Sequence, residues 1–192
     1  MSYYSNRAGE CLSKDVDREI RASHAGETGA VYIYRGALFA EFILNVVRPA
    51  KSNSESYAFI CEHLHTEKQH LAIFENEMPQ FRGSILLPLW IAAGFVTGFL
   101  PRMFGKNSFF YTVYCVEQFV DEHYENQCQR LSSLHNVPPN VIDLFRLCQK
   151  DEQQHRDDAR AKVTCSPNLA MKCWGRGLAI GSSLAVRFAE HL

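Results

Sequence analysis

The sequence lacks a surplus of charge of either sign. Its 192 residues contain 20 Lys and Arg against 21 Asp and Glu, so the formal net charge at pH 7 is −1. A chain with no overall positive field has no general attraction for nucleic acid, which we exclude as a partner. Any affinity for a membrane surface must then come from local apolar or basic patches.

Disulfide and secretion patterns are also missing. The seven cysteines, at positions 11, 61, 115, 128, 148, 165 and 173, form no Cys-x-x-Cys and are odd in number, which is typical of a reducing compartment. We expect each of them to be a small filler of the core. Residues 1–14 contain no apolar segment of the kind a signal peptide has, and we expect them to be flexible.

No uninterrupted apolar run is long enough to cross a bilayer. Residues 85–100 are uncharged, but these sixteen positions fall short of the roughly 20 that a span needs. They are also interrupted or followed by Pro88, Gly94, Gly98 and Pro101. We therefore interpret 85–104 as a helix lying on a membrane surface, with a buried core helix as the alternative.

Three basic residues flank this apolar segment: Arg82, Arg102 and Lys106. Long basic side chains beside an apolar surface helix can reach the anionic headgroups of lipids. The sequence therefore predicts that these three side chains contact the membrane.

Hydrophobic periodicity predicts six helices and no convincing strand. The expected helices begin at a cap, Ser13 or Asp15, and run to 47, then cover 54–77, 85–104, 108–134 with Ser108 as cap, 140–161 and 168–191. With 46% hydrophobic residues, the chain can build one sizeable core, so we expect 1–192 to be a single all-α domain. Four helices would form a bundle, and two would cover it or associate with the membrane.

One metal-binding pattern occurs twice in the chain. Each copy has a lone Glu followed by Glu-x-x-His, and the two glutamates are 67 − 27 = 40 positions apart in the first copy and 152 − 117 = 35 positions apart in the second. The residues are Glu27, Glu67, His70, Glu117, Glu152 and His155. Because residues three apart share a helical face, four such helices can hold two metal ions in the interior of a bundle.

The charges of this set favour two divalent ions. Four buried carboxylates need four positive charges to offset the cost of burial, and ligation by carboxylate and imidazole without thiolate favours iron or manganese. A chance placement of surface Glu and His is the alternative, because Glu-x-x-His is short. The second copy, at a similar hairpin spacing, favours the metal site.

A third Glu-x-x-His, at Glu62 and His65, lies in the wrong register. At about 100° per residue, Glu62 is about 140° round the helix from Glu67, away from the stripe formed by Ile60, His63, Glu67, His70 and Phe74. We reject it as a ligand pair.

Four more polar residues are candidates, and three of them have two interpretations each. Asp151 either hydrogen-bonds a ligating imidazole on the facing helix or is simply solvated. His24 shares the face of Glu27 and is either packed or ligating. Tyr124 follows Glu117 by one heptad and lies near the metals or packs in the core, whereas His123 is rotated by about 120° toward a helix flank.

The chain resembles a known family, the demethoxyubiquinone hydroxylases of ubiquinone biosynthesis. Together the matching stretches extend over most of residues 18–190. They are Arg21-Ala-Ser-His-Ala-Gly-Glu-Thr-Gly-Ala30, Ile33-Tyr34-Arg-Gly36, Glu67-Lys-Gln-His70-Leu71, Leu87-Pro-Leu-Trp-Ile-Ala-Ala-Gly94-Phe95, Val116-Glu117, His123-Tyr124 and Asp151-Glu152-Gln-Gln-His155. The chain departs from the family pattern at Ser23, which usually is Asp or Asn, and in a longer connection before Glu67.

The resemblance implies a ferritin-like di-iron monooxygenase. It would insert one oxygen atom of O2 into the ring of demethoxyubiquinone in the penultimate step of ubiquinone synthesis, with NADH as electron donor. The family's six iron ligands match the six residues of the doubled pattern, and His123 with Tyr124 matches a pair associated with substrate and electron transfer.

The resemblance also implies partners and a location. The partners are the membrane surface, a lipid-binding protein of ubiquinone biosynthesis and a larger synthesis complex. The location is the matrix side of the mitochondrial inner membrane, with the cytoplasmic side of a bacterial plasma membrane as the alternative. Two other functions stay open: an iron oxidase like ferritin or rubrerythrin, and a non-catalytic lipid-binding scaffold.

Overall fold

The computed structural model describes residues 13–47, 54–77, 84–135 and 137–191, which form helices and no strand. The helices are α1 (Lys14–Val47), α2 (Ser54–Glu77), α3 (Leu87–Phe104), α4 (Lys106–Ser133), α5 (Pro139–Lys162) and α6 (Leu169–His191). The expected all-α fold is confirmed. The flexible segment expected at 1–14 falls outside the described residues except for its last two, and Lys14 is already helical.

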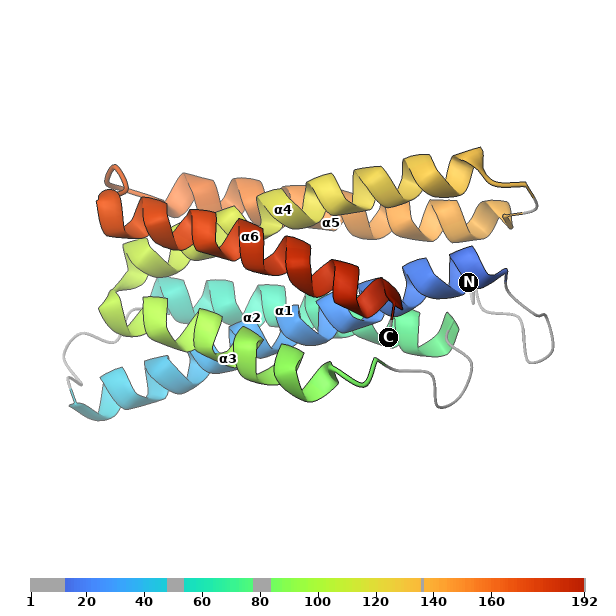
Figure 1. Cartoon of the computed structure of the whole chain (residues 1–192). Coiled ribbons are helices and arrows are strands. Elements are labelled where there is room, and N and C mark those ends of the chain that lie inside the picture. The colour runs from blue at the N-terminus through green and yellow to red at the C-terminus, as the bar shows by residue number, and fades with distance from the viewer. Residues whose placement is uncertain (1–12, 48–53, 78–83, 136, 192) are drawn as a thin grey trace.

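Four of the helices form a bundle and two cover one side of it. The hairpin of α1 and α2 packs against the hairpin of α4 and α5, and α3 is the crossover between the two hairpins (Figure 1). α3 packs on α1 and α4, and α6 crosses the same two helices. The side of the bundle made by α1 and α4 is therefore the covered one.

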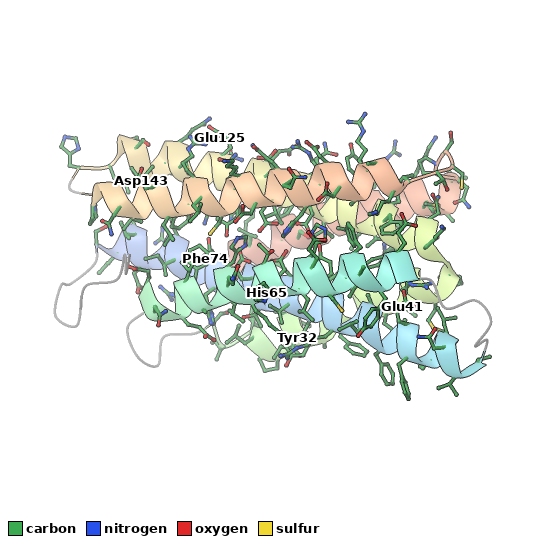
Figure 2. The ribbon with its side chains drawn as sticks, turned by 180° about the vertical axis from the view of Figure 1, so that it is seen from behind. Tyr32, Glu41, His65, Phe74, Glu125 and Asp143 are labelled. Atoms are coloured by element: carbon green, nitrogen blue, oxygen red, sulfur yellow. The ribbon has the colours of Figure 1, made fainter. Side chains whose placement is uncertain are left out.

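The interior of the bundle contains two apolar clusters. We name them after a phenylalanine of each: the Phe59 cluster, which includes Val31, Phe110 and Ala159, and the Phe74 cluster, which includes Ile20, Leu131 and Phe145. Phe74 points into the space between α2 and α5, where its ring meets Phe145 at 5.5 Å (Figure 2). On each bundle helix one cluster lies before the doubled metal pattern and the other lies after it.

Glycines let α3 approach α1 closely. A Cβ atom on Gly94 would lie 2.3 Å from the carbonyl oxygen of Gly29, and one on Gly98 would lie 1.8 Å from that of Ile33. Pro88 stands in the first turn and Pro101 in the last turn of a helix that runs without a break. The prediction that these residues interrupt the segment is therefore wrong, because the glycines serve contact between two helices.

α3 is partly exposed, so it is not the buried core helix of the alternative interpretation. Large apolar side chains stand in solvent along it, among them Leu89, Val96 and Phe104. By length and composition alone, α1 and α3 are the two helices in the described ranges that could cross a membrane, a test that the core helix of a soluble protein also passes.

Arg102 does not face outward, and the prediction that it contacts lipid headgroups is wrong. Its side chain is buried and its Nε lies 2.7 Å from Oε1 of Glu41, which also accepts a hydrogen bond from Ser56 at 2.5 Å. A buried guanidinium needs a carboxylate partner, and α1 provides one. Lys106 is exposed, 3.7 Å from Glu55, and Arg82 lies outside the described residues.

The helix starts agree with the sequence at one of the two predicted caps. The Oγ of Ser13 accepts a hydrogen bond from the backbone N–H of Val16 at 3.3 Å, which confirms Ser13 as a cap. Ser108 is not a cap, because α4 begins two residues earlier, after Gly105, whose φ of 128° lets the chain turn from α3 into α4.

The cysteines only partly fill the core. Cys128 and Cys148 are buried and Cys61 and Cys115 are intermediate, whereas Cys165 and Cys173 are exposed. The core prediction is wrong for these last two because they follow the bundle, in the connection after α5 and on the outer helix α6. Cys11 lies outside the described residues.

Candidate metal centre

Six buried side chains converge in the middle of the bundle, between the Phe59 and Phe74 clusters. They come from four helices: Glu27 of α1, Glu67 and His70 of α2, Glu117 of α4, and Glu152 and His155 of α5. None is more than 5% exposed. The structure thus brings together all six residues of the doubled pattern, and their role as metal ligands stays a prediction.

The six side chains form two groups of four with two members in common. One group is Glu27, Glu67, His70 and Glu152, and the other is Glu67, Glu117, Glu152 and His155. In each group one ligand atom per residue lies within 4.8 Å of all the others. Two neighbouring positions that share two carboxylates are what a pair of bridged ions requires.

The imidazole nitrogens face the carboxylates at short distances. Nδ1 of His70 lies 2.9 Å from Oε1 of Glu152, and Nδ1 of His155 lies 3.1 Å from Oε1 of Glu67. Neither nitrogen makes a hydrogen bond of acceptable geometry, and both oxygens also lack a hydrogen-bond partner. Buried nitrogen and oxygen atoms that lie this close together without forming hydrogen bonds have the arrangement expected of ligands around a common ion.

Burial makes this cluster unfavourable without positive charge. The pKa of Glu67 is raised to about 8 by burial and by repulsion from Glu152, and burial with the same repulsion raises the pKa of Glu117 well above its usual value. Burial lowers the pKa of His155, but the carboxylates of Glu152 and Glu67 outweigh it and raise the pKa to about 11. These side chains therefore fit bound cations. Without cations, the carboxyl groups keep their protons or pair with protonated imidazoles.

Two tyrosines stabilise the lone glutamates in a reciprocal way. The hydroxyl of Tyr34 donates to Oε1 of Glu117 at 3.1 Å, and the hydroxyl of Tyr124 donates to Oε1 of Glu27. Tyr34 follows Glu27 by 34 − 27 = 7 residues and Tyr124 follows Glu117 by 124 − 117 = 7. Each tyrosine therefore points across the bundle to the lone glutamate of the other helix.

Asp151 contacts the centre from outside. Its Oδ2 lies 3.1 Å from Nε2 of His70, which confirms the expected hydrogen bond to an imidazole on the facing helix. A carboxylate in this position fixes the ring orientation and strengthens the ligand nitrogen on its other side.

The cluster has the features of a metal site, as the orphaned atoms show. Buried oxygens of Glu27, Glu67 and Glu152 have no hydrogen-bond partner, and neither does Nδ1 of His70 or His155. Buried polar groups are almost always satisfied in folded proteins. Oxygen and imidazole donors without thiolate match iron or manganese, so the donor set fits the two ions inferred from the sequence.

A cavity of about 380 Å³ leads to these carboxylates. It is enclosed by α1, α3, α4 and α6, and apolar side chains such as Ile33, Trp90 and Leu178 line it. Glu27, Glu67, Glu117 and Glu152 lie on its wall. A mostly apolar pocket that ends on a polar cluster is typical of a small-molecule site.

His123 also lines this cavity, although its helix position indicated only a flank. Its ring stacks on Phe119 at 6.1 Å, and Nε2 is buried without a hydrogen-bond partner. Burial lowers the pKa of His123 to about 4. Helix periodicity could not place it on the cavity wall, because the covering helices α3 and α6 create that wall.

The remaining candidates lie apart from the two groups. Glu62 and His65 are exposed, and Nε2 of His65 contacts Gln69 at 3.2 Å, which agrees with their rejection as ligands. His24 is buried but belongs to neither group. The sequence assigned no role to Tyr34 or His63, although both lie on the inward stripes of their helices.

The fold and this cluster define a class: an all-α bundle protein with a buried carboxylate and imidazole centre suited to two metal ions. The comparison with family models is specific. The model described as Ubiquinone biosynthesis protein COQ7 matches residues 14–189. The chain belongs to this family.

Individual relatives agree with the family. The chain is 29% identical over 142 residues to the NADPH-dependent 3-demethoxyubiquinone 3-hydroxylase of Dictyostelium discoideum, which covers 73% of this chain and 61% of that protein. It is 31% identical over 144 residues to the 3-demethoxyubiquinol 3-hydroxylase of Rhodospirillum rubrum, which covers 74% and 62%. With the rat NADPH-dependent 3-demethoxyubiquinone 3-hydroxylase, identity is 36% over 182 residues, with 92% and 77% covered. The chain thus matches less than two thirds of the length of the first two.

Proposed function

We propose that this chain is a di-iron monooxygenase that hydroxylates the ring of demethoxyubiquinone in ubiquinone biosynthesis. The observation that carries the proposal is the junction of an apolar cavity with a buried carboxylate and imidazole cluster. Leu178 and Trp90 belong to the apolar part, and Glu27 and Glu117 lie where the cavity meets the cluster. The cavity would hold the quinone ring against the metal centre.

The ligands would be the six residues of the doubled pattern. Glu67 and Glu152, which both groups share, would help to hold both ions, while Glu27 with His70 and Glu117 with His155 would complete the two positions. Bound iron would supply the activation of O2 and the redox chemistry. The bundle would exclude bulk water from the reacting atoms, because apolar clusters close it on both sides.

Tyr124 and His123 would act on the substrate side. Tyr124 holds Glu27 by a hydrogen bond and is fully buried, so it would fix this carboxylate while the substrate is bound. Burial lowers the pKa of His123 to about 4, so its imidazole would be neutral near pH 7, and its buried Nε2, which lacks a hydrogen-bond partner, would bond an oxygen of the quinone head. The electron donor we propose is a reduced nicotinamide dinucleotide: the resemblance implies NADH, and the Dictyostelium and rat relatives are named NADPH-dependent.

The proposed substrate has an apolar tail, and the same two helices that close the cavity offer an apolar outer surface. Leu89 and Val96 of α3 and Ile180 and Leu184 of α6 are exposed. An apolar exposed face of this kind favours contact with a membrane. We propose a peripheral location on the mitochondrial inner membrane, matrix side, or on a bacterial plasma membrane, with a lipid-binding protein and a larger synthesis complex as partners.

The experiment expresses the chain and two variants in a strain deleted for its own hydroxylase. It measures the ubiquinone restored in the strain and the iron content of each purified protein. Glu152→Ala should abolish restoration of ubiquinone and lower the iron content from about two ions per chain. Glu62→Ala, at the exposed Glu-x-x-His of α2, should leave both unchanged. An active, iron-replete Glu152→Ala protein contradicts the proposal.

The same experiment separates the other two functions. An iron oxidase would bind iron through Glu152 without restoring ubiquinone in any variant. A lipid-binding scaffold would restore ubiquinone without bound iron and would tolerate Glu152→Ala.

A further inference from the structure

The two halves of the proposed metal centre differ in the hydrogen-bond partner of the imidazole's outer nitrogen. His70 has a carboxylate acceptor on its outer nitrogen, because Oδ2 of Asp151 lies 3.1 Å from Nε2. Asp151 precedes Glu152, and the corresponding position before Glu67 is Thr66. In the part of the chain that the structure describes, His155 has contacts from Nδ1 to Glu67 and Glu152 but no hydrogen bond to Nε2.

Another imidazole lies against His155 instead. The rings of His63 and His155 are 4.2 Å apart between centroids and inclined at 73°, an edge-to-face contact. His63 precedes Glu67 by one helical turn and is 3% exposed. It is not a member of either group of four.

His63 is itself held in place by aromatic rings. The ring of Phe59 lies 3.9 Å away and that of Tyr34 lies 5.9 Å away, nearly parallel at 13°. Nε2 of His63 lies 4.0 Å from Oδ2 of Asp158, on the same helix as His155. Tyr34 also donates a hydrogen bond to Glu117. The packed rings of Phe59, Tyr34 and His63 together therefore contact two side chains of the second group, Glu117 and His155.

The hydrogen bond from His70 to Asp151 and the ring contact of His155 with His63 have different consequences for the imidazole as a metal ligand. A carboxylate on the far nitrogen of an imidazole fixes the ring and makes the ligating nitrogen more basic, and its loss typically costs about 10- to 100-fold in metal affinity. Packing against a neighbouring ring fixes orientation but adds no negative charge. The position completed by His155 should therefore hold its ion less tightly than the one completed by His70.

We propose that the two metal positions are unequal. The position of Glu27 and His70 binds first and more tightly, and the position of Glu117 and His155 binds second, with His63 as a positioning residue that holds the His155 ring where a carboxylate is missing. The inference rests on the proposed metal centre, and it concerns the order of binding.

The test is an anaerobic titration of the metal-free full chain with Co²⁺ alone, followed by calorimetry and by the visible absorption of bound cobalt. The wild type should show two steps whose dissociation constants differ by about 10-fold or more. In crystals grown with one equivalent of Co²⁺, the anomalous signal should lie beside His70. A single step for two equal ions, or a first ion beside His155, overturns the inference.

Variants assign each step. Asp151→Asn should weaken the first step by about 10- to 100-fold and bring the two steps together. His63→Leu should weaken the second step and alter the spectrum of the second ion, and the first step should stay as it is. The matched control is His65→Leu on the exposed face of α2, which should change neither step.

A rescue variant distinguishes positioning from loss of structure. Thr66→Asp places a carboxylate where Asp151 stands in the other half, so it should tighten the second step in the wild type and restore it in the His63→Leu protein. If His63→Leu does not fold, Thr66→Asp and Asp151→Asn in the wild-type background decide the matter, and no effect of either overturns the inference. A wild-type chain that binds no Co²⁺ overturns the proposed function itself, whereas two equal sites overturn only the order of binding.

Discussion

The hydroxyl of Tyr34 on α1 donates a hydrogen bond to Glu117 on α4, at 3.1 Å. It is the counterpart of the bond from Tyr124 on α4 to Glu27 on α1. Both tyrosines are fully buried. Each gives one oxygen of a glutamate a hydrogen-bond partner and so orients the other oxygen toward the centre of the bundle.

Tyr34→Phe and Tyr124→Phe should each lower metal affinity by about 10-fold, because each loses the group that orients a lone glutamate. Metal titration of the purified variants measures the effect. Tyr32→Phe is the matched control, since Tyr32 is half-buried at the edge of the Phe59 cluster, with the guanidinium of Arg35 4.6 Å from its ring centroid. Unchanged affinity in both inner variants would show that the two bonds do not support the centre.

The contribution of Glu67 to the stability of the metal-free protein should fall as the pH rises from about 4.5 to about 8. Glu67 has an ordinary pKa of 4.5, raised to about 8 by burial and by repulsion from Glu152. Its carboxyl group therefore binds a proton more tightly in the folded chain than in the unfolded one. The stability this gives is complete below pH 4.5 and is lost as the pH rises through 8.

Urea unfolding at a series of pH values tests this expectation. The free energy of unfolding of the wild type, minus that of Glu67→Gln, should fall by up to about 1.4 kcal/mol for each pH unit in that window. Glu67→Gln should flatten the dependence, and the exposed Glu62→Gln should keep it. An equal slope in Glu67→Gln would assign the effect to other groups.

The buried pair of Glu41 and Arg102 should be costly to break from one side. Arg102→Met leaves Glu41 buried beside Ser56 without its cation, and the expected loss is about 3 to 5 kcal/mol. The double variant Glu41→Leu with Arg102→Met should recover most of the loss, because no unpaired charge remains. Figure 2 shows Glu41 toward the opposite end of the bundle from Phe74, so metal content should be unaffected.

Chemical denaturation of the single and double variants measures this coupling. Lys106→Met is the control, since its exposed pair with Glu55 should contribute little to stability. A double variant no more stable than Arg102→Met would show that side-chain packing, and not charge pairing, holds this contact.

Gly98→Ala should destabilise the contact of α3 with α1 by about 1 to 3 kcal/mol, because the added Cβ meets the carbonyl oxygen of Ile33. Thermal unfolding measures it. Gly177→Ala on α6 is the control: a Cβ there meets no atom within 4 Å, and a helical alanine is more favourable than glycine by up to about 1 kcal/mol. A Gly98→Ala chain as stable as the wild type would mean that α3 can move away from α1 without loss.

The sequence predicted the inner face of each bundle helix well. A helix repeats every 3.6 residues whatever it packs against, so Glu67 and His70 could be separated from the decoy Glu62 and His65 by angle alone. The sequence left Asp151 with two interpretations, and the structure decides for the hydrogen bond with His70. Local chemistry also narrowed the cap of α1 to Ser13 or Asp15, and the structure shows Ser13.

The sequence failed where a side chain depends on a distant partner. Arg102 was expected at a membrane surface, but Glu41, 61 positions earlier, draws it into the interior. His123 was expected on a flank, and the covering helices turned that flank into a cavity wall. The glycines of α3 were expected to interrupt a segment, yet they are contact points with α1.

By itself the sequence determined six helices, their inward faces and the six residues that share those faces, because all of this follows from local periodicity. Only the tertiary structure decided that Tyr34 reaches Glu117, that His63 lies against His155 and that α3 and α6 enclose a cavity. These contacts join residues far apart in the chain, and their geometry depends on how the helices pack against one another.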